Sequence, residues 1–442
     1  MPPNYQKNIY FLIPIYMKTK EMIQRISLFL FVLVLAALAW AQGNNGNEVV
    51  SIGSKEDWQA FCNRVNNNGE TGLNAKLTTD INLGTDIVML GKYSPYKGTF
   101  DGQGHTLKFD WDGGSRDDIA PFKYVRGATI RNLRTQGKIT TKGSNLSGLV
   151  LEANGGTTTI SRCVTDVDIT GGRAGEASYA AGLIQTIDLY ARVTITDCVV
   201  KGSITDNEGD GWQEMAGFVY VNSGSCTLTN CLYVSKNNAS NENCRTFADG
   251  NANTLTLTNC YYLTACGKVQ GEHITEARLA SGEVTKLLQD NRENLVWGQT
   301  LGTDNEPQLI AFAPAAEKVY QVKFSYNGKV TATRYANNGG KVKLPTAQEL
   351  LGTAYDATKT YTLAFDGGNF SATTTISSDR TVNVTVTTPT GIDGVTDDRV
   401  GERNAAVYDL AGRRVADRLD AATRSLLPAG VYIVGGRKVI VK

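Results

Sequence analysis

The densest set of chemically active side chains in this 442-residue chain lies at 206–214, with the sequence DNEGDGWQE. Its first, third and fifth positions (Asp206, Glu208 and Asp210) supply oxygen atoms, and a glycine follows at the sixth, as at the start of a calcium-binding loop. The twelfth position is Gly217 where such a loop has a bidentate glutamate, so only Glu214 could complete the ligand set. The segment favours a solvated acidic turn, and calcium is left open as a cofactor.

Aromatic residues accompany this acidic run. Trp212 lies inside it, and Tyr179 closes an earlier polar loop, 171–179, that also carries Arg173 and Glu176. Exposed aromatic rings supply stacking surface for sugars and anchoring area for proteins. We therefore name Tyr179, Trp212, Arg173 and Glu176 as candidate ligand-binding residues, with a glycan or a surface protein as the partner.

Paired carboxylates of the kind that hydrolyse glycosides are absent from the aligned repeats described below. Such enzymes hold two carboxyl groups about 5–9.5 Å apart. Asp166 and Asp168 occupy two different register positions, and each is expected to pair with a lysine, Lys201 and Lys138 respectively. His105 is expected to bond the backbone of the next coil. No catalytic residue is named, and no nucleotide-binding loop or serine nucleophile motif occurs.

These residues sit in a repeated sequence. A phrase close to Thr-Ile-Thr-Asn-Cys occurs five times, at 129–133, 159–163, 194–198, 227–231 and 256–260. A second β-branched run follows each of the earlier copies, and the first three are also followed by a Gly-Leu or Gly-Phe run. Alternating β-branched residues, glycine corners and the regular spacing of the five phrases predict an all-β chain. Its coils are expected to form a parallel β-solenoid, which buries apolar side chains by stacking one coil on the next.

Stacking predicts columns of equivalent residues about 4.8 Å apart. The last residue of each phrase is expected to face inward, giving a column of Leu133, Cys163, Cys198, Cys231 and Cys260. A disulfide takes Cβ atoms about 3.8 Å apart, so these cysteines are expected to be buried free thiols. Cys226, Cys244 and Cys266 fall outside the column, and one loop disulfide among them stays open.

Loops inserted in successive coils emerge together on one side of a solenoid. The polar loops 141–146, 171–179 and 206–214 are therefore expected to lie side by side. They carry most of the candidate binding residues, so this loop edge is the expected functional surface.

The ends of the solenoid need covers. The segment 55–65 is expected to be a short amphipathic helix with Trp58, Phe61 and Val65 on one side, which suits a cap. Beyond the β-helix and its cap, 42–313, alternating strands and an Asn327-Gly328 turn predict a small β-module at 317–388. A further small β domain follows at 391–442, and it is expected to end in a hairpin on a Gly435-Gly436 turn.

The net charge and the N-terminal leader limit the partners and the cellular compartment of the protein. The net charge of +1 excludes the basic surface of a nucleic-acid binder. Residues 1–41 have basic residues, a short apolar core and an Ala39-Trp40-Ala41 end, typical of a leader with a cleaved signal peptide. The alternative is a membrane anchor, but the apolar run is shorter than the about 20 residues that span a bilayer. The processed chain is expected to have no membrane span.

Two parts of the chain resemble known families. Residues 77–107, with "TTDI" and "FDGQGHTL", and the runs at 148–150 and 182–184 resemble the secreted right-handed β-helices of the GLUG-motif family, without that motif's final glycine. The phrases at 406–415 and 427–442 resemble the C-terminal sorting domain of type IX secretion substrates. This resemblance implies export, with the tail recognised by the export machinery.

The sequence thus predicts an exported cell-surface or secreted adhesion protein that binds a glycan or a protein. Two alternatives stay open. One is a polysaccharide-degrading β-helix enzyme, a lyase or a glycoside hydrolase. The other is a structural spacer on the cell surface.

Overall fold

The computed structural model describes residues 48–172, 178–206, 213–235, 241–388, 395–396 and 405–441. The chain divides into two units, one up to Val319 and one from Tyr320. The first unit is a right-handed parallel β-helix, the hand that nearly all parallel crossovers take. The second holds two small β domains. The expected fold class is therefore confirmed.

The repeated phrases stack in register. Thr129, Thr159, Thr194, Thr227 and Thr256 face one another in successive coils. Their strands belong to a 15-stranded sheet. Among the described residues it comprises β1 (Val49–Ile52), β2 (Asn74–Leu77), β3 (Ile81–Asn82), β4 (Thr99–Asp101), β5 (Thr106–Gly114), β7 (Thr129–Arg131), β8 (Arg134–Thr141), β11 (Gly156–Ser161), β12 (Val164–Gly171), β15 (Ala191–Thr196), β16 (Val199–Val200), β17 (Ile204–Asp206), β20 (Ser225–Tyr233), β21 (Leu255–Tyr262) and β22 (Glu272–His273).

Two further parallel sheets complete the coils. One consists of β6 (Phe122–Val125), β10 (Val150–Ala153), β14 (Ile184–Ile187) and β19 (Val219–Asn222). The other consists of β9 (Leu146–Ser147), β13 (Ser178–Ala181) and β18 (Gln213–Ala216). They meet at a glycine corner, Gly148, Gly182 and Gly217, where a Cβ on Gly148 would lie 2.3 Å from the Gly182 carbonyl oxygen. Because no side chain fits that gap, the corner requires glycine.

The predicted inward column is confirmed. Leu133, Cys163, Cys198, Cys231 and Cys260 are all buried in the main core, and all eight cysteines are thiols with no disulfide between them. The residue before each of them has a left-handed backbone, which the sequence reasoning did not anticipate. The φ angles are 51° at Asn132, 51° at Arg162, 55° at Asp197, 54° at Asn230 and 50° at Asn259. Asn and Asp tolerate this region better than other side chains, so the column marks a tight turn in every coil.

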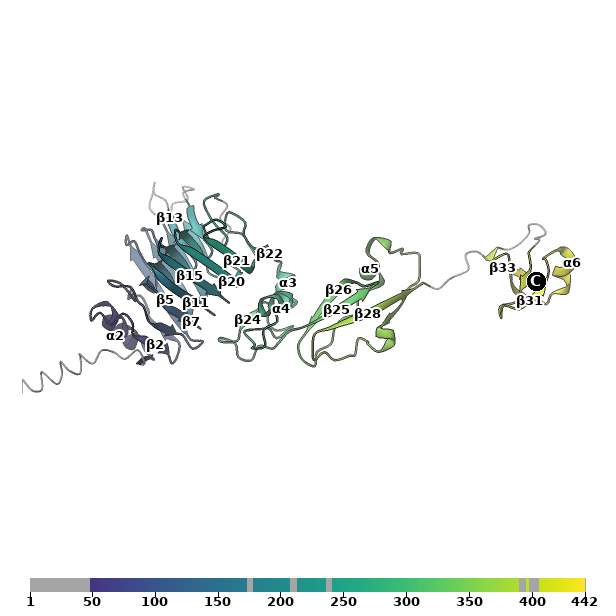
Figure 1. The fold of residues 1–442 in the computed structure, drawn as a ribbon, viewed down its shortest axis with the longest axis horizontal. Helices are drawn as coiled ribbons and strands as arrows, with labels where there is room; N and C mark the ends of the chain where they lie inside the picture. Colours follow the sequence, from purple (N-terminus) through teal and green to yellow (C-terminus); the bar gives the residue numbers. More distant parts are fainter. Residues whose placement is uncertain are drawn as a thin grey trace, which may run out of the picture. The chain divides into compact units, whose positions relative to one another are not determined.

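The predicted cap is also confirmed. Helix α2 (Lys55–Asn66) covers the N-terminal end of the stack (Figure 1) with Trp58, Phe61 and Val65 buried. Ser54 begins the helix, since its side chain accepts a hydrogen bond from the Asp57 backbone N–H.

The segment after the repeats packs along the outer flank of the stack. It contains α3 (Glu276–Ala280), α4 (Glu283–Gln289), β23 (Trp297–Gly298) and β24 (Gln308–Leu309). Its apolar residues form a second core with one outward column of the coils, made of Val164, Val199, Leu232 and Tyr261.

Polar and close contacts bind this flanking segment, 274–312, to coils far apart in the stack. Trp297 Nε1 donates to Asp197 at 2.7 Å, and the Arg292 guanidinium lies 2.9 Å from the same carboxylate. Phe312 lies 4.8 Å under the Arg134 guanidinium. A Cβ on Gly104 would lie 1.9 Å from the carbonyl oxygen of the residue before Phe312, so the segment also reaches the coil of β5.

The first small domain is a four-stranded sheet with its own core. Its strands are β25 (Tyr320–Tyr326), β26 (Lys329–Ala336), β27 (Thr362–Phe365) and β28 (Arg380–Thr387), with α5 (Ala347–Leu351) and two 3-10 turns, Gly352–Ala354 and Asp366–Gly368. Asn327 and Gly328 have φ angles of 50° and 78°, as the predicted hairpin turn requires.

The last small domain is a five-stranded sheet, also with its own core. Its strands are β29 (Val395–Thr396), β30 (Val407–Tyr408), β31 (Arg414–Ala416), β32 (Gly430–Val434) and β33 (Arg437–Val441), and it contains α6 (Ala421–Leu426). The predicted Gly435-Gly436 hairpin turn joins β32 to β33. Over the described part of the chain, no helix is both long and apolar enough to cross a bilayer.

Candidate functional site

The loop edge is assembled as expected in its described part. Strands β9, β13 and β18 lie side by side, and the Gly172 backbone N–H donates to the Gly143 carbonyl at 2.9 Å. Asp206 lies in register with Gly171. The loops 141–146, 171–179 and 206–214 thus leave the stack at neighbouring positions. The candidate residues Arg173, Glu176, Glu208, Asp210 and Trp212 lie outside the described residues.

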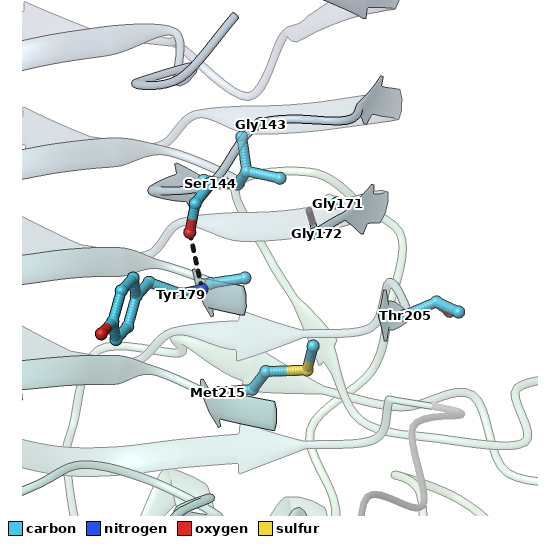
Figure 2. A pocket seen from close by; sticks show the side chains of 9 residues that line it. Gly143, Ser144, Gly171, Gly172, Tyr179, Thr205 and Met215 are labelled. Atoms are coloured by element: carbon cyan, nitrogen blue, oxygen red, sulfur yellow. Dashed lines mark hydrogen bonds between the residues drawn. The ribbon is translucent and has the colours of Figure 1, made fainter. Parts of the chain in front are cut away.

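A crevice lies behind the start of these strands, between Ser144, Thr205 and Met215 (Figure 2). The Ser144 hydroxyl accepts a hydrogen bond from the Tyr179 backbone N–H at 2.9 Å, and the Tyr179 ring projects away from Thr205. The crevice has no volume open to a water molecule. It is a packing gap, so any ligand must bind on the outer side, where the ring of Tyr179 lies.

The outer side of the three-stranded sheet presents a polar column. Ile119, Leu146 and Ala180 are paired in successive coils, so the residues that precede them, Asp118, Asn145 and Tyr179, also lie in register. Tyr179 pairs in turn with Glu214. The column is therefore Asp118, Asn145, Tyr179 and Glu214. Asn145 Nδ2 donates to Asp118 Oδ1 at 3.0 Å.

The four-stranded sheet presents a second column across the glycine corner, made of Lys123, Leu151, Gln185 and Tyr220. Side chains of the two columns meet: Lys123 Nζ lies 3.3 Å from the Asp118 carboxylate, and the Tyr220 hydroxyl donates to Glu214. The rings of Tyr179 and Tyr220 have centroids 5.6 Å apart at 36°. Side chains of the two sheets therefore contact one another across the glycine corner. We call these two columns the outer corner.

Tyr220 is the binding-type residue that the sequence reasoning missed. The apolar run of that coil ends at Val219, so the pattern placed a strand there without marking the next side chain. Its polar partner Glu214 was named only as a calcium ligand. The corner at Gly217 places β18 and β19 in two adjoining sheets, and Glu214 and Tyr220 meet across it.

The outer corner carries several acidic groups. Burial raises the pKa of Tyr220, and its hydrogen bond with Glu214 raises it further. Burial also raises the pKa of Glu152, in the next column of the same sheet, and the carboxylates of Asp188 and Asp118 add to this. Such a surface can stack rings on tyrosine and accept hydrogen bonds from hydroxyl or ammonium donors.

The expected lysine pairing of the two strand aspartates was wrong. Lys138 Nζ lies 3.3 Å from Asp110, which precedes it in the same column, and Lys201 pairs with Glu306 of the flanking segment. Asp168 instead accepts from the Ser203 backbone N–H at 3.0 Å. The aligned repeats had left out the coil of β5 and the flanking segment, which supply the actual partners.

Two smaller expectations changed as well. Asp166 accepts a hydrogen bond from Gln136 Nε2 at 3.2 Å. His105 Nδ1 lies 3.3 Å from Asp80 Oδ1, so this histidine faces a carboxylate and not the backbone of the next coil. The close approach of the flanking segment explains Gly104, whereas Gly102 is explained by the close approach of Asn132 and Leu133 in the next coil.

The calcium loop stays a prediction. Of its four ligands, Asp206 is buried at the end of β17, and Glu214 is engaged by the Tyr220 hydroxyl. The other two, Glu208 and Asp210, lie outside the described residues. Within the described ranges, no group of three or more His, Cys, Asp or Glu side chains is arranged to hold a metal.

A larger open cavity, of about 610 Å³, lies beside α3 and is lined by Leu263, Asn305 and Glu306 among others. Sequence reasoning had no signal for it, since it forms where the flanking segment folds onto the stack. None of its lining residues is aromatic. It therefore offers less stacking surface than the outer corner.

Comparisons with known proteins add little to this geometry. No family model matches the sequence, and no curated protein does so either. Among solved structures, one similar chain is described as a putative immunoglobulin A1 protease from Bacteroides ovatus. It is 14% identical, with a TM-score of 0.38 over 59% of this chain and 92% of that chain.

Proposed function

We propose that this chain is an exported protein, secreted or held at the outer cell surface, which binds a glycan at the outer corner. The observation that carries the proposal is the pair of tyrosine rings, Tyr179 and Tyr220, on the outside of two adjoining coils with Glu214 between them.

The chemistry of the corner suits a sugar. Aromatic rings stack on the apolar face of a pyranose, and the hydroxyls around the sugar's rim need acceptors. A carboxylate offers about four acceptor positions, so Glu214 can accept from a ligand hydroxyl while it holds Tyr220. Asn145 adds an amide group next to Tyr179 in its column, and the buried Gln185 lies next to Tyr220 in the other column.

The stacked coils can contact a ligand over a long distance. Each column repeats at the spacing of the strands, about 4.8 Å. A linear glycan laid along the stack would therefore meet outward side chains from several coils, and a short oligosaccharide would meet fewer. Affinity is expected to rise with chain length until the ligand spans the described coils.

The proposal is tested by screening the purified full chain against a glycan array, followed by calorimetry on the strongest ligand. The Tyr220→Ala variant is expected to lose about tenfold or more in affinity, roughly 1.4 kcal/mol, because it removes a ring and frees Glu214. Tyr220→Phe keeps the ring and is expected to lose less. Tyr190→Ala is the matched control, since Tyr190 is 81% exposed outside the corner.

The same experiment distinguishes the alternatives. If no glycan is retained, the spacer interpretation gains. If a polysaccharide is shortened during the assay, the enzyme interpretation gains. If Tyr220→Ala and Tyr190→Ala bind equally well, the outer corner is not the site.

A further inference from the structure

On the face formed by β9, β13 and β18, the last coils of the solenoid are joined by few backbone contacts. Earlier in the stack, β13 pairs with β18 over four consecutive residues. Beyond β18 the same face continues through single bridges, Ala216 to Arg245 and Arg245 to Lys268. A terminal coil has a neighbour on one side only, so it gains less from stacking than an internal coil.

Two cysteines lie at this weak point. Cys244 and Cys266 are both buried in the main core, and their thiols are hydrogen-bonded to each other. The Lys268 backbone N–H donates to the Cys244 carbonyl at 2.9 Å, and a Cβ on Gly267 would lie 2.4 Å from Cys244 Cβ. The chain around Cys266 therefore packs directly against Cys244.

We propose that Cys244 and Cys266 form a disulfide that clamps the last coil to the coil before it. This inference rests on the proposed export, since disulfides form and persist in oxidising compartments. It also singles out one pair among thiols that touch. Cys231 and Cys260 are neighbours too, but they lie in register on β20 and β21. Regular strand spacing holds their Cβ atoms near 4.8 Å, beyond the reach of a relaxed disulfide.

In the folded coil the two thiols are unequal. The hydrogen bond from Cys266 lowers the pKa of Cys244, and the Arg245 guanidinium adds to this, while the same contact raises the pKa of Cys266. During folding, before this contact has formed, the thiolate of either cysteine attacks a small disulfide oxidant such as oxidised glutathione, which releases one glutathione thiolate and leaves a mixed disulfide. The other cysteine then gives up its proton and attacks the protein-side sulfur of that mixed disulfide, which releases the second glutathione thiolate.

The balance is two electrons and two protons. Two protein thiols become one disulfide, and one glutathione disulfide becomes two glutathione thiols. Because both sulfurs are buried in the folded coil, the exchange belongs to folding, before the last coil closes over them.

The test is to unfold the reduced full chain, refold it in a glutathione redox buffer, and map its peptides without reduction. We expect one cross-link, between Cys244 and Cys266, with Cys163, Cys198, Cys231 and Cys260 still reduced. The cross-link should raise the thermal midpoint of the β-helix by about 5 °C or more over the chain refolded with a reductant.

Variants separate the cross-link from simple packing. Cys266→Ala should abolish the difference between oxidised and reduced midpoints, whereas Cys226→Ala, a matched buried cysteine, should preserve it. Recovering both thiols as alkylated peptides from the correctly refolded wild-type chain overturns the proposal, even if a variant does not fold. The measurement uses neither a glycan nor a cell, so it can fail independently of the proposed function.

Discussion

Single side chains set the turn that every coil repeats. The residue before each inward column position has a left-handed backbone, and all of these side chains except Asp197 bond a neighbour along the stack. Asn132 Nδ2 donates to Asp101 Oδ1 at 2.9 Å, and Asn259 Nδ2 donates to Asn230 Oδ1 at 3.2 Å. Asn and Asp accept this conformation at little cost, whereas most L-residues pay about 1–2 kcal/mol. The column is thus a conformational requirement as well as a hydrogen-bonding ladder.

Asp101, at the start of that ladder, makes the β-helix sensitive to acid. Burial raises its pKa, but hydrogen bonds from Asn132, the Gln103 backbone and Arg131 outweigh burial and hold the pKa below its ordinary 3.8. A lowered pKa stabilises the fold above the ordinary value, and this contribution is lost as the pH falls through the lower folded-state value. Thermal midpoints from about pH 6 to pH 2.5 should therefore fall less steeply for Asp101→Asn than for the wild type.

The two curves are compared because other carboxylates also titrate in this range. An acid slope that is the same in wild type and Asp101→Asn would contradict the role assigned to this carboxyl group. Asp86→Asn is the control, since its ion pair with Lys55 is exposed and should contribute little.

At the residue level, sequence reasoning found the inward column but not its left-handed neighbours. The spacing of the repeated phrases shows which residues stack, because equivalent residues occupy the same place in each phrase. It does not show backbone angles, and Arg162 at an Asn position hid the requirement. It also paired Lys138 and Lys201 with the wrong acids, because their partners lie in segments outside the repeated pattern.

Among the elements, the flanking segment 274–312 shows where pattern reasoning ends. The strands, the cap helix and the hairpin turns follow from local signals of alternation, amphipathicity and Asn-Gly or Gly-Gly pairs. The contact of Trp297 with Asp197 joins residues 100 positions apart, and nothing local encodes it. The apolar outward column that this segment covers resembles an inward one in the sequence.

Asp197 is the polar centre of that docking. Its side chain is 4% exposed, accepts a hydrogen bond from Trp297 Nε1 and forms an ion pair with Arg292. Asp197→Ala should lower the free energy of unfolding by about 3 kcal/mol, because it leaves the partly buried Arg292 guanidinium and the buried Trp297 N–H without their acceptor. Asp197→Asn keeps an acceptor and tolerates the left-handed backbone, so it should cost about half as much. Urea unfolding of the full chain measures both.

The exposed ion pair of Lys55 and Asp86, at 2.7 Å, supplies the comparison. Asp86→Ala should change the unfolding free energy by less than about 1 kcal/mol. Equal losses for Asp86→Ala and Asp197→Ala would show that the flanking segment is not held by the buried pair.

In the whole molecule, each of the three parts has its own core. The apolar residues of the β-helix, the four-stranded module and the five-stranded C-terminal domain form separate clusters. Separate cores with few shared contacts unfold independently.

Fold class was predictable at this scale because repeats and hairpin signals are dense, whereas the outer corner was only half predictable. Its loops were expected side by side, but the meeting of Tyr179 with Tyr220 needed the angle between two sheets.

Deletion of residues 391–442 should leave the thermal unfolding of the β-helix unchanged, because none of the residues described in that domain belongs to the β-helix core. If the tail is the export address that its sequence resembles, the same deletion should remove the protein from the cell surface. Differential scanning calorimetry checks the first expectation, and surface labelling of cells checks the second. Normal surface display of the truncated chain would refute the sorting role.

The flanking segment also limits how this gene can evolve. Solenoids commonly lengthen when a repeat is duplicated, since a new coil stacks on either neighbour. Here one stretch of chain starts at the last coil, contacts Asp197 midway and reaches Arg134 and Gly104 near the first coils. The length of this segment matches the distance between its contact points. A duplicated coil between these points would move them apart by one strand spacing, about 4.8 Å, so the number of coils there can change only together with the length of the flanking segment.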